Sequence, residues 1–367
     1  MASPEILDFD SLLRPISDEL PSGVELKEDS AGNALYYQVK DARDAAATAE
    51  RAQRDYAMLS DEDKEAEGAP PVPVPPDWRT VLKLATDLLS QHSKDLWIAA
   101  WAIEALCRLH GFAGLRDGFR LTRELAERFW DGIHPAPDEE GYLTTVAQLT
   151  GLNGDDSDGA LIAPINNIPI TDEGTYGRLT SAQYKDAADG RGEMPLEAFD
   201  RAALETSTEF FEGLVENIAQ AQAEFAALTT VLERKCGESQ DGYSTAPPSS
   251  QISGALRDCL DRVKSIARHR LAPDEETGDE PGALVEVGGG VPADRKTMTR
   301  EDAFRLLLQV SEYFRKTEPH SPVSYSLEQA VRWGRMSLPD LLGELIKDET
   351  ARDDIFRRVG IPDRADD

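Results

Sequence analysis

The chain has 367 residues, of which 40% are hydrophobic, and its 69 acidic against 39 basic residues give a formal net charge of −30. A surface this acidic repels phosphate backbones and anionic lipid, so we expect protein partners and no nucleic acid. An acid excess that only aids solubility is equally compatible with this composition. No apolar run approaches the ~18 residues of a membrane span, and the N-terminus lacks the pattern of a secretory signal, so no direct membrane insertion is expected.

The three cysteines also bear on the cellular compartment. Cys107, Cys236 and Cys259 lack the spacing of metal ligands. We interpret them as reduced thiols of a cytoplasmic protein.

Residues 1–60 are expected to form a helical N-terminal segment. From about Ala34 to Tyr56, apolar residues recur every three or four positions, which predicts an Ala-rich amphipathic helix. Residues 61–76 follow as an acidic stretch and a Pro-Val-Pro tract, Ala69–Pro76, which favours extended polyproline geometry. We interpret this segment as a mobile connector, and a Pro-rich ligand for a peptide-binding domain is the alternative.

Residues 77–171 carry four of the five tryptophans, and their first part reads as three consecutive helices. Asp77 is the expected N-cap of the first helix, and Ser93 that of the second. The second helix is apolar nearly all round, so we expect it to be the buried hub of the domain. Gly111 should end it, and Gly132 with Pro135 should end the third helix. The expected core of this hub is formed by four side chains: Trp78, Trp97, Trp101 and Trp130.

The rest of this region is less regular. Tyr142–Leu152 predicts one more short helix, and the acidic loop Gly151–Gly159 resembles a calcium loop without its ligand pattern, so it is interpreted as a solvated turn. Leu161–Thr171 contains two prolines and is expected to be an extended edge or a loop across the helices.

The second half of the chain alternates helices with linkers. Residues 172–236 are expected to form a long helix region with a heptad seam, and residues 237–250 a Ser/Pro/Gly-rich linker. Residues 251–271 predict another helix. Residues 272–298 are acidic and poor in large apolar side chains, which is typical of a disordered linker. The seam consists of apolar residues at alternating spacings of three and four: Phe211, Leu214, Ile218, Ala221, Phe225, Leu228 and Leu232.

Residues 299–367 predict a small helical module that is too small for an independent core, which favours self-association. One of its helices should bury a side formed by five residues: Val323, Leu327, Ala330, Val331 and Gly334. Basic and aromatic residues beside this face are the candidate oligomer or partner interface: Tyr325, Arg332, Trp333 and Arg335. Trp333 could equally fold over the core of its own module.

The chain shows no motif for catalysis. It contains no phosphate loop, dinucleotide fingerprint, HExxH or GxSxG pattern. The histidines are scattered, and capping or surface roles explain them better than a metal or general-base role. No catalytic, cofactor-binding or metal-binding residue is therefore predicted. The five histidines are His92, His110, His134, His269 and His320.

Several segments resemble the ImpA N-terminal domain of TssA proteins, which are components of the bacterial type VI secretion system. The similar segments in the first half are Leu13–Ser17, Pro21–Gly23, Pro76–Trp78, Ser93–Leu96, Gly111–Leu115, Phe129–Asp131 and His134–Pro135. Tyr313–Val323 and Ala330–Arg335 are similar to the C-terminal module of the short TssA class. The matches span both ends of the chain and leave the acidic linkers uncovered.

The resemblance implies an all-α, multi-domain, non-enzymatic scaffold of the cytoplasm that needs no cofactor. It further implies a homo-oligomeric ring, of six or twelve subunits, that contacts sheath, inner-tube and baseplate proteins. Such a protein would organise baseplate and tail assembly through its C-terminal region. Two alternatives remain at this point: an acidic helical adaptor unrelated to secretion, and an enzyme with an unrecognised site.

Overall fold

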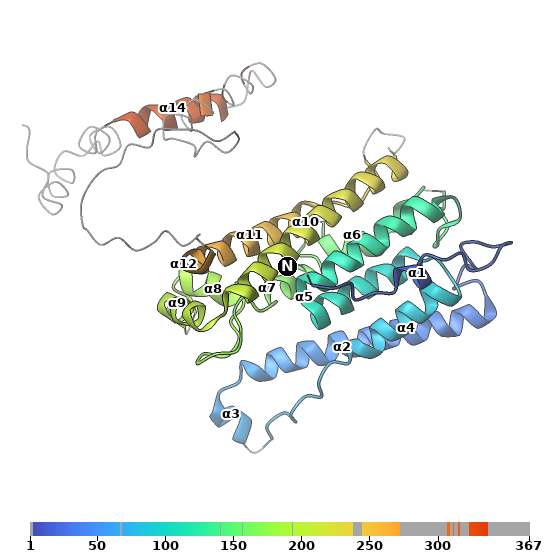
Figure 1. Cartoon of the computed structure of the whole chain (residues 1–367), viewed down its shortest axis with the longest axis horizontal. Helices are drawn as coiled ribbons and strands as arrows, with labels where there is room; N and C mark the ends of the chain where they lie inside the picture. The colour runs from blue at the N-terminus through green and yellow to red at the C-terminus, as the bar shows by residue number, and fades with distance from the viewer. Residues whose placement is uncertain are drawn as a thin grey trace, which may run out of the picture. The chain divides into compact units, whose positions relative to one another are not determined.

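The computed structural model describes residues 3–66, 68–139, 141–155, 157–192, 194–237, 244–271, 307, 308, 311, 315 and 323–336. The chain divides into two compact units, Met1–Thr277 and Gly278–Asp367. Throughout the described residues the regular elements are helices, and β-pairing is limited to isolated bridges. The all-α prediction is therefore confirmed (Figure 1).

The first four helices begin at side-chain caps, as the sequence predicts for the fourth. Asp77 accepts a hydrogen bond from the Thr80 N–H at 3.1 Å and caps the fourth helix. The long second helix matches the predicted Ala-rich helix and packs along the fourth. The bounds are α1 (Phe9–Leu12), α2 (Ser30–Ala57), α3 (Asp61–Glu65) and α4 (Trp78–Gln91).

The predicted second and third hub helices form one kinked element, α5 (Leu96–Phe129). Gly111 interrupts it with φ +56°, a left-handed value that glycine adopts without strain. The predicted cap was wrong: Asp95 caps α5 through the N–H groups of Trp97 and Ile98, and Ser93 donates to the carbonyl of Val24. The apolar half of α5 is buried among its neighbours, as expected of a hub.

Short helices follow α5, and some of them differ from the sequence-based expectation. A helical turn lies inside Leu161–Thr171, where an edge or loop was predicted; Pro164 sits within its first turn, where proline is tolerated. Two further helices were missed because each shows only one or two turns of apolar periodicity. The bounds are η1 (Trp130–Gly132), α6 (Leu143–Asn153), α7 (Ile162–Asn166), α8 (Ser181–Ala188) and α9 (Leu196–Glu205).

The heptad prediction is confirmed in α10 (Thr208–Cys236), which packs against α5 and α11 (Ser250–Ile266). All seam residues except the half-buried Leu214 are buried. Gly237 ends α10, as predicted. Figure 1 shows α10 and α11 lying alongside α5 and α6, with α12 (Arg268–Leu271) at the end of α11.

The described part of the 237–250 linker is held against the end of α10. Thr245 is buried, and its hydroxyl donates to the carbonyl of Cys236 at 3.0 Å. Residues 238–243 lie outside the described part of the chain. The segment therefore does not behave along its whole length as the unanchored linker that its composition predicted.

The second unit contains α14 (Val323–Arg335), which confirms a helix after Pro322. Val331 and Ser324 are buried, whereas Ala330 is exposed, so the predicted inward face was wrong at this residue. The predicted disordered linker, 272–298, lies outside the described residues, as do most residues of the predicted module 299–367.

One described helix, Leu96–Gly132, is long and apolar enough to cross a membrane by composition alone. In the structure, 78% of its most apolar window is buried inside the protein. Its hydrophobicity is therefore explained by its place as the core helix of the first unit.

Candidate functional site

Three separate segments of the chain meet at the start of α5. The N–H of Lys94 donates to the carbonyl of Ser22 at 2.7 Å, and the N–H of Leu96 to that of His134 at 2.8 Å. The N–H of His134 returns a bond of 3.0 Å to the carbonyl of Lys94. The short motifs around these residues, which are far apart in sequence, are thus parts of one junction.

Lys94 is fully buried at this junction. Its ammonium nitrogen lies 2.7 Å from the carbonyl oxygen of Leu12 and 2.8 Å from that of Leu89, at the ends of α1 and α4. Burial lowers the pKa of Lys94 to about 8. A positive charge beside two helix C-termini satisfies carbonyls that have no partner within their own helices. Lys94 therefore ties α1 and α4 to the start of α5.

An acidic and basic cluster surrounds the same point. Burial raises the pKa of Asp95 to about 6, although its carboxylate accepts two N–H groups at the start of α5. Glu25 accepts from His134 Nδ1 at 3.1 Å and from the Ala136 N–H at 3.0 Å. Burial opposes the charge on both partners, but these hydrogen bonds hold the pKa of Glu25 below and that of His134 above its usual value. The geometry is that of a structural ion pair between loops.

The four predicted hub tryptophans lie around α5, but the structure does not bring them together in one cluster. Trp101 and Trp130 are buried in the main core and Trp97 is half-buried against it. Trp78 is buried in a smaller cluster with Ala46, Val81 and Ala105. All four act as packing residues in this arrangement.

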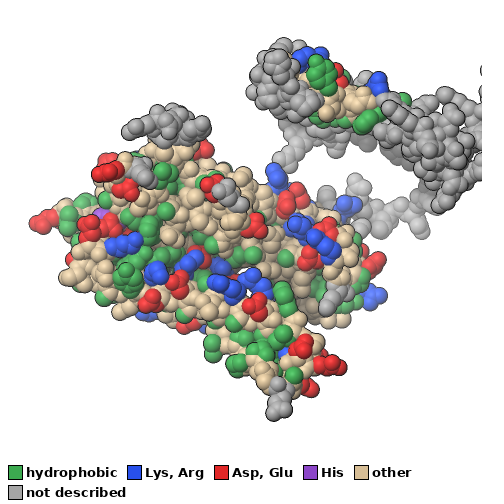
Figure 2. Space-filling view, turned by 180° about the vertical axis from the view of Figure 1, so that it is seen from behind, with side chains coloured by type: hydrophobic (Ala, Val, Ile, Leu, Met, Phe, Trp, Pro, Cys, Tyr) green, Lys and Arg blue, Asp and Glu red, His purple; other side chains and the backbone are tan. Residues whose placement is uncertain are grey.

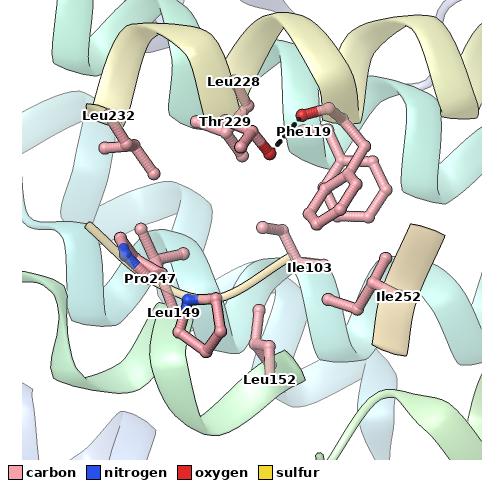
Figure 3. Close-up of a pocket in the computed structure, with 11 residues that line it drawn as sticks. Ile103, Phe119, Leu149, Leu152, Leu228, Thr229, Leu232, Pro247 and Ile252 are labelled. Carbon is pink, nitrogen blue, oxygen red and sulfur yellow. Dashed lines mark hydrogen bonds between the residues drawn. The ribbon is translucent and has the colours of Figure 1, made fainter. Parts of the chain in front are cut away.

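An apolar cavity between α5, α6, α10 and α11 is shown in Figure 3. Its volume is about 20 Å³, and Pro247 from the segment before α11 closes one side. The single hydrogen bond drawn runs from the Thr229 hydroxyl to the carbonyl of Phe225 at 3.0 Å, within α10. A space of this size admits little more than one water molecule. It is a packing defect of the core and not a ligand site.

A larger groove of about 710 Å³ opens beside the kink at Gly111. Its lining combines prolines and aromatic side chains with a few polar groups, the usual character of a ligand-binding groove. Apolar lining residues are Pro76, Trp78, Phe112, Pro164, Ile168, Pro169, Phe210 and Leu214. Charged lining residues are Arg178 and the ion pair of Arg108 with Glu50, whose nitrogen and oxygen lie 2.7 Å apart. Sequence reasoning missed this groove because its walls come from six segments that are far apart in the chain.

The groove and the junction offer no visible catalytic chemistry. Among the residues that the structure describes, no group of three or more His, Cys, Asp or Glu side chains could hold a metal ion. The described cysteines are free and buried, and burial raises the pKa of Cys107 to about 12. A thiol with so high a pKa is a poor nucleophile.

The predicted interface residues lie on α14. Tyr325 and Arg332 are exposed, Trp333 is half-buried, and the side chain of Arg335 lies outside the described set. The indole N–H of Trp333 is buried and has no acceptor among the described residues. Tyr325 lies near Arg315, whose guanidinium is 5.9 Å from its ring and also pairs with Glu328.

Comparison with known proteins finds similarity to components of type VI secretion systems. Residues 13–154 match the family model "ImpA, N-terminal, type VI secretion system". The chain is 27% identical over 368 residues to the "Type VI secretion system component TssA1" of Pseudomonas aeruginosa PAO1, covering 96% of this chain and 98% of that protein.

A solved structure supports the fold of the first unit. It is the N-terminal domain, including the ImpA_N region, of the TssA component of Burkholderia cenocepacia, with a TM-score of 0.56, 23% identity, and coverage of 74% of this chain and 99% of that one. The motifs that meet at the start of α5 fall inside the matched family region. Residues 13–154 thus match the ImpA N-terminal family model, and nearly the whole chain is similar to a TssA component of a type VI secretion system.

Proposed function

We propose that this protein is a non-enzymatic assembly factor that organises the baseplate and tail of a type VI secretion system. The observation that carries this proposal is the similarity to TssA1, which extends over 96% of the chain and thus covers both compact units. The similarity is therefore not confined to the ImpA N-terminal region at residues 13–154.

The chemistry of the first unit supports a structural role. The charged groups at the start of α5, the buried Lys94 and Asp95 and the half-buried Glu25 and His134, are engaged with backbone groups or with one another. None of them lines the groove beside Gly111. Groups that hold a scaffold together in this way are not arranged to act on a substrate.

The second unit is the proposed centre of self-association. Residues 299–367 form a ring of identical subunits in this proposal, with Tyr325, Arg332, Trp333 and Arg335 at or near the contact. Interfaces favour tryptophan and arginine as anchors, and α14 presents both beside an exposed tyrosine. The net charge of −30 favours cytoplasmic protein partners with basic faces, which we propose to be sheath, inner-tube and baseplate proteins.

Genetic complementation tests the proposed role. In the source bacterium, deletion of the gene is expected to abolish release of the inner-tube protein into the medium and to prevent sheath assembly in fluorescence microscopy. The full chain should restore both, and a chain that ends at residue 298 should restore neither. The Met58→Ala chain, which changes an exposed side chain of the first unit, is the matched control and should restore both. Secretion that continues unchanged in the deletion strain would contradict the proposal.

A further inference from the structure

Both ring nitrogens of His134 face hydrogen-bond acceptors. Nδ1 lies 3.1 Å from Oε2 of Glu25, and Nε2 lies 3.3 Å from the carbonyl oxygen of Gly23. A backbone carbonyl and an ionised carboxylate accept hydrogen bonds but cannot donate them. A neutral imidazole carries a proton on one nitrogen and therefore makes one of these two bonds. The ring makes both bonds only as an imidazolium, with a proton on each nitrogen.

The Glu25 carboxyl group is ionised in this arrangement. Its Oε2 also accepts the N–H of Ala136 at 3.0 Å, so two donors point at one oxygen. Burial would raise the pKa of Glu25, but the hydrogen bonds from His134 and Ala136 outweigh burial and lower this pKa. Burial would likewise lower the pKa of His134, but the bond to Glu25 outweighs burial and raises that pKa. Both pKa shifts favour the imidazolium–carboxylate pair that the distances require.

The pair of His134 with Glu25 is shielded from water. Figure 2 shows acidic and basic side chains mixed over one face of the first unit, where water and salt screen pairs of opposite charge. The side chains of His134 and Glu25, by contrast, are only 15% and 18% exposed. Water therefore replaces a hydrogen bond lost at this place less readily than one lost at the open surface.

The other charged side chains of the junction also favour the imidazolium or are engaged elsewhere. The negative charge of Asp95 raises the pKa of His134. The ammonium of Lys27 lies 3.7 Å from the centre of the Trp97 ring, and that of Lys94 is bonded to two backbone carbonyls. The titratable groups that surround the ring come from three elements: Glu25 and Lys27 before α2, Tyr36 in α2, and Lys94 and Asp95 at the start of α5.

The ring closes one side of segment 22–25, and the end of α4 closes the other. The N–H of Val24 donates to the carbonyl of His92 at 3.2 Å. A Cβ on Gly23 would lie 2.0 Å from the same carbonyl oxygen, so the segment is closely packed there. When Nε2 loses its proton, its lone pair faces the carbonyl of Gly23, and two acceptors repel each other. Nδ1 keeps its proton because its acceptor is a charged carboxylate.

We propose that the His134 imidazolium is a proton-dependent latch, which holds segment 22–25 against the start of α5 and releases it when Nε2 loses its proton. The folded pKa of His134 is raised above 6.5, so the stabilisation is complete below pH 6.5 and is lost as the pH rises through the folded pKa. The latch depends neither on the secretion role nor on self-association through residues 299–367.

Titration of the ring in the full-length protein tests its protonation. NMR of protein with ¹⁵N-labelled histidine follows both ring nitrogens, and the spectrum of His134→Gln assigns their signals. The midpoint of the His134 titration should lie above pH 6.5, with protons on both nitrogens below it and on Nδ1 above it. A midpoint at or below pH 6.5, or a neutral ring that keeps its proton on Nε2, would overturn the proposal.

A matched pair of variants tests the role of the carboxylate. Glu25→Gln removes the charge opposite Nδ1 and should lower the midpoint of the His134 titration. Glu28→Gln removes an exposed charge from the same loop and should leave the midpoint as in the wild-type protein. Equal midpoints in the wild-type, Glu25→Gln and Glu28→Gln proteins would contradict the pairing of His134 with Glu25.

Hydrogen exchange of the Val24 amide tests the release of the segment. In the wild-type protein its protection, corrected for the intrinsic pH dependence of exchange, should fall by about fivefold from pH 6 to pH 8, the effect of one lost hydrogen bond. Protection should be constant with pH in His134→Gln. His92→Gln, an exposed histidine at the end of α4, is the control and should behave as the wild-type protein. Constant protection in the wild-type protein, or an equal fall in His134→Gln, would overturn the latch.

Discussion

The two units of the chain differ in how completely their described residues are buried. In the first unit, one continuous hydrophobic cluster runs from Leu7 to Ala267. Among the described residues after Thr277, Val331 is the one hydrophobic side chain in the buried class, and Tyr325 is 64% exposed. The comparison teaches that the first unit has a continuous core of its own, whereas the described part of the second shows a single buried apolar side chain.

The largest expected effect is on the core of the first unit. Trp101→Ala removes a side chain that packs against Tyr36 with ring centroids 5.4 Å apart and donates to Gln148 at 3.3 Å. Its free energy of unfolding should fall by roughly 3–5 kcal/mol, as for other buried tryptophans. Denaturant titration measures this. A loss near zero would break the comparison, because it would show that the hub is not the stabilising core.

The junction at the start of α5 should give the next largest effect. Lys94→Ala leaves the carbonyls of Leu12 and Leu89 without their buried donor, and the free energy of unfolding should fall by about 2 kcal/mol. Lys83→Ala is the matched control in α4, because the exposed ion pair of Lys83 with Asp87 should contribute less than about 1 kcal/mol. Equal losses in the two variants would contradict the structural role of Lys94.

Close packing within α5 predicts a difference between two glycines. A Cβ on Gly114 would lie 2.1 Å from the carbonyl oxygen of Leu106, so Gly114→Ala should destabilise the first unit by roughly 1–3 kcal/mol. Gly254 in α11 has nothing within 4 Å of such a Cβ, and Gly254→Ala should stabilise by up to about 1 kcal/mol. Thermal unfolding measures both, and a stabilised Gly114→Ala protein would show that the kink is looser than described.

A further expected effect is a pH dependence at Lys94. Its folded pKa of about 8 lies below the usual 10.5, so the unfolded chain binds more protons between these values. The contribution of Lys94 to the free energy of unfolding should therefore rise from pH 8 to pH 10.5. The difference between the wild-type protein and Lys94→Met, followed by denaturant titration over this range, isolates that contribution. If the difference in free energy of unfolding between the two proteins does not change with pH, the pKa of Lys94 is not lowered in the folded protein.

The apolar half of α5 and the seam of α10 could be predicted from sequence because their spacing is local. Residues 96–107 are apolar on nearly every side, and the α10 seam repeats without interruption. The polar half of α5 could not be predicted in this way. Asp117 accepts from the N–H of Ile6 at 2.6 Å, and Arg123 pairs with Glu224 at 3.0 Å. Such partners lie about a hundred residues apart, and no local period relates them.

The junction at the start of α5 and the groove beside Gly111 could also be predicted from the sequence only in part, because distant segments form them. The motifs around Gly23, Lys94 and His134 were visible in the sequence, but only the fold shows that they meet at one junction. Ser93 was expected to cap α5 because serine is a common N-cap, yet Asp95 lies closer to the first turn and takes that role. The groove beside Gly111 had no local signal apart from the glycine that produces the kink.

Mass measurement of the assembly tests most directly the claim that the first unit is self-sufficient and the second unit self-associates. Size-exclusion chromatography with light scattering compares the full chain, a chain that ends at residue 298, and Trp333→Ala. We predict a large defined oligomer for the full chain, a folded monomer or small oligomer for the truncated one, and weakened assembly with unchanged helicity for Trp333→Ala. A truncated chain that still forms the full oligomer would contradict the account.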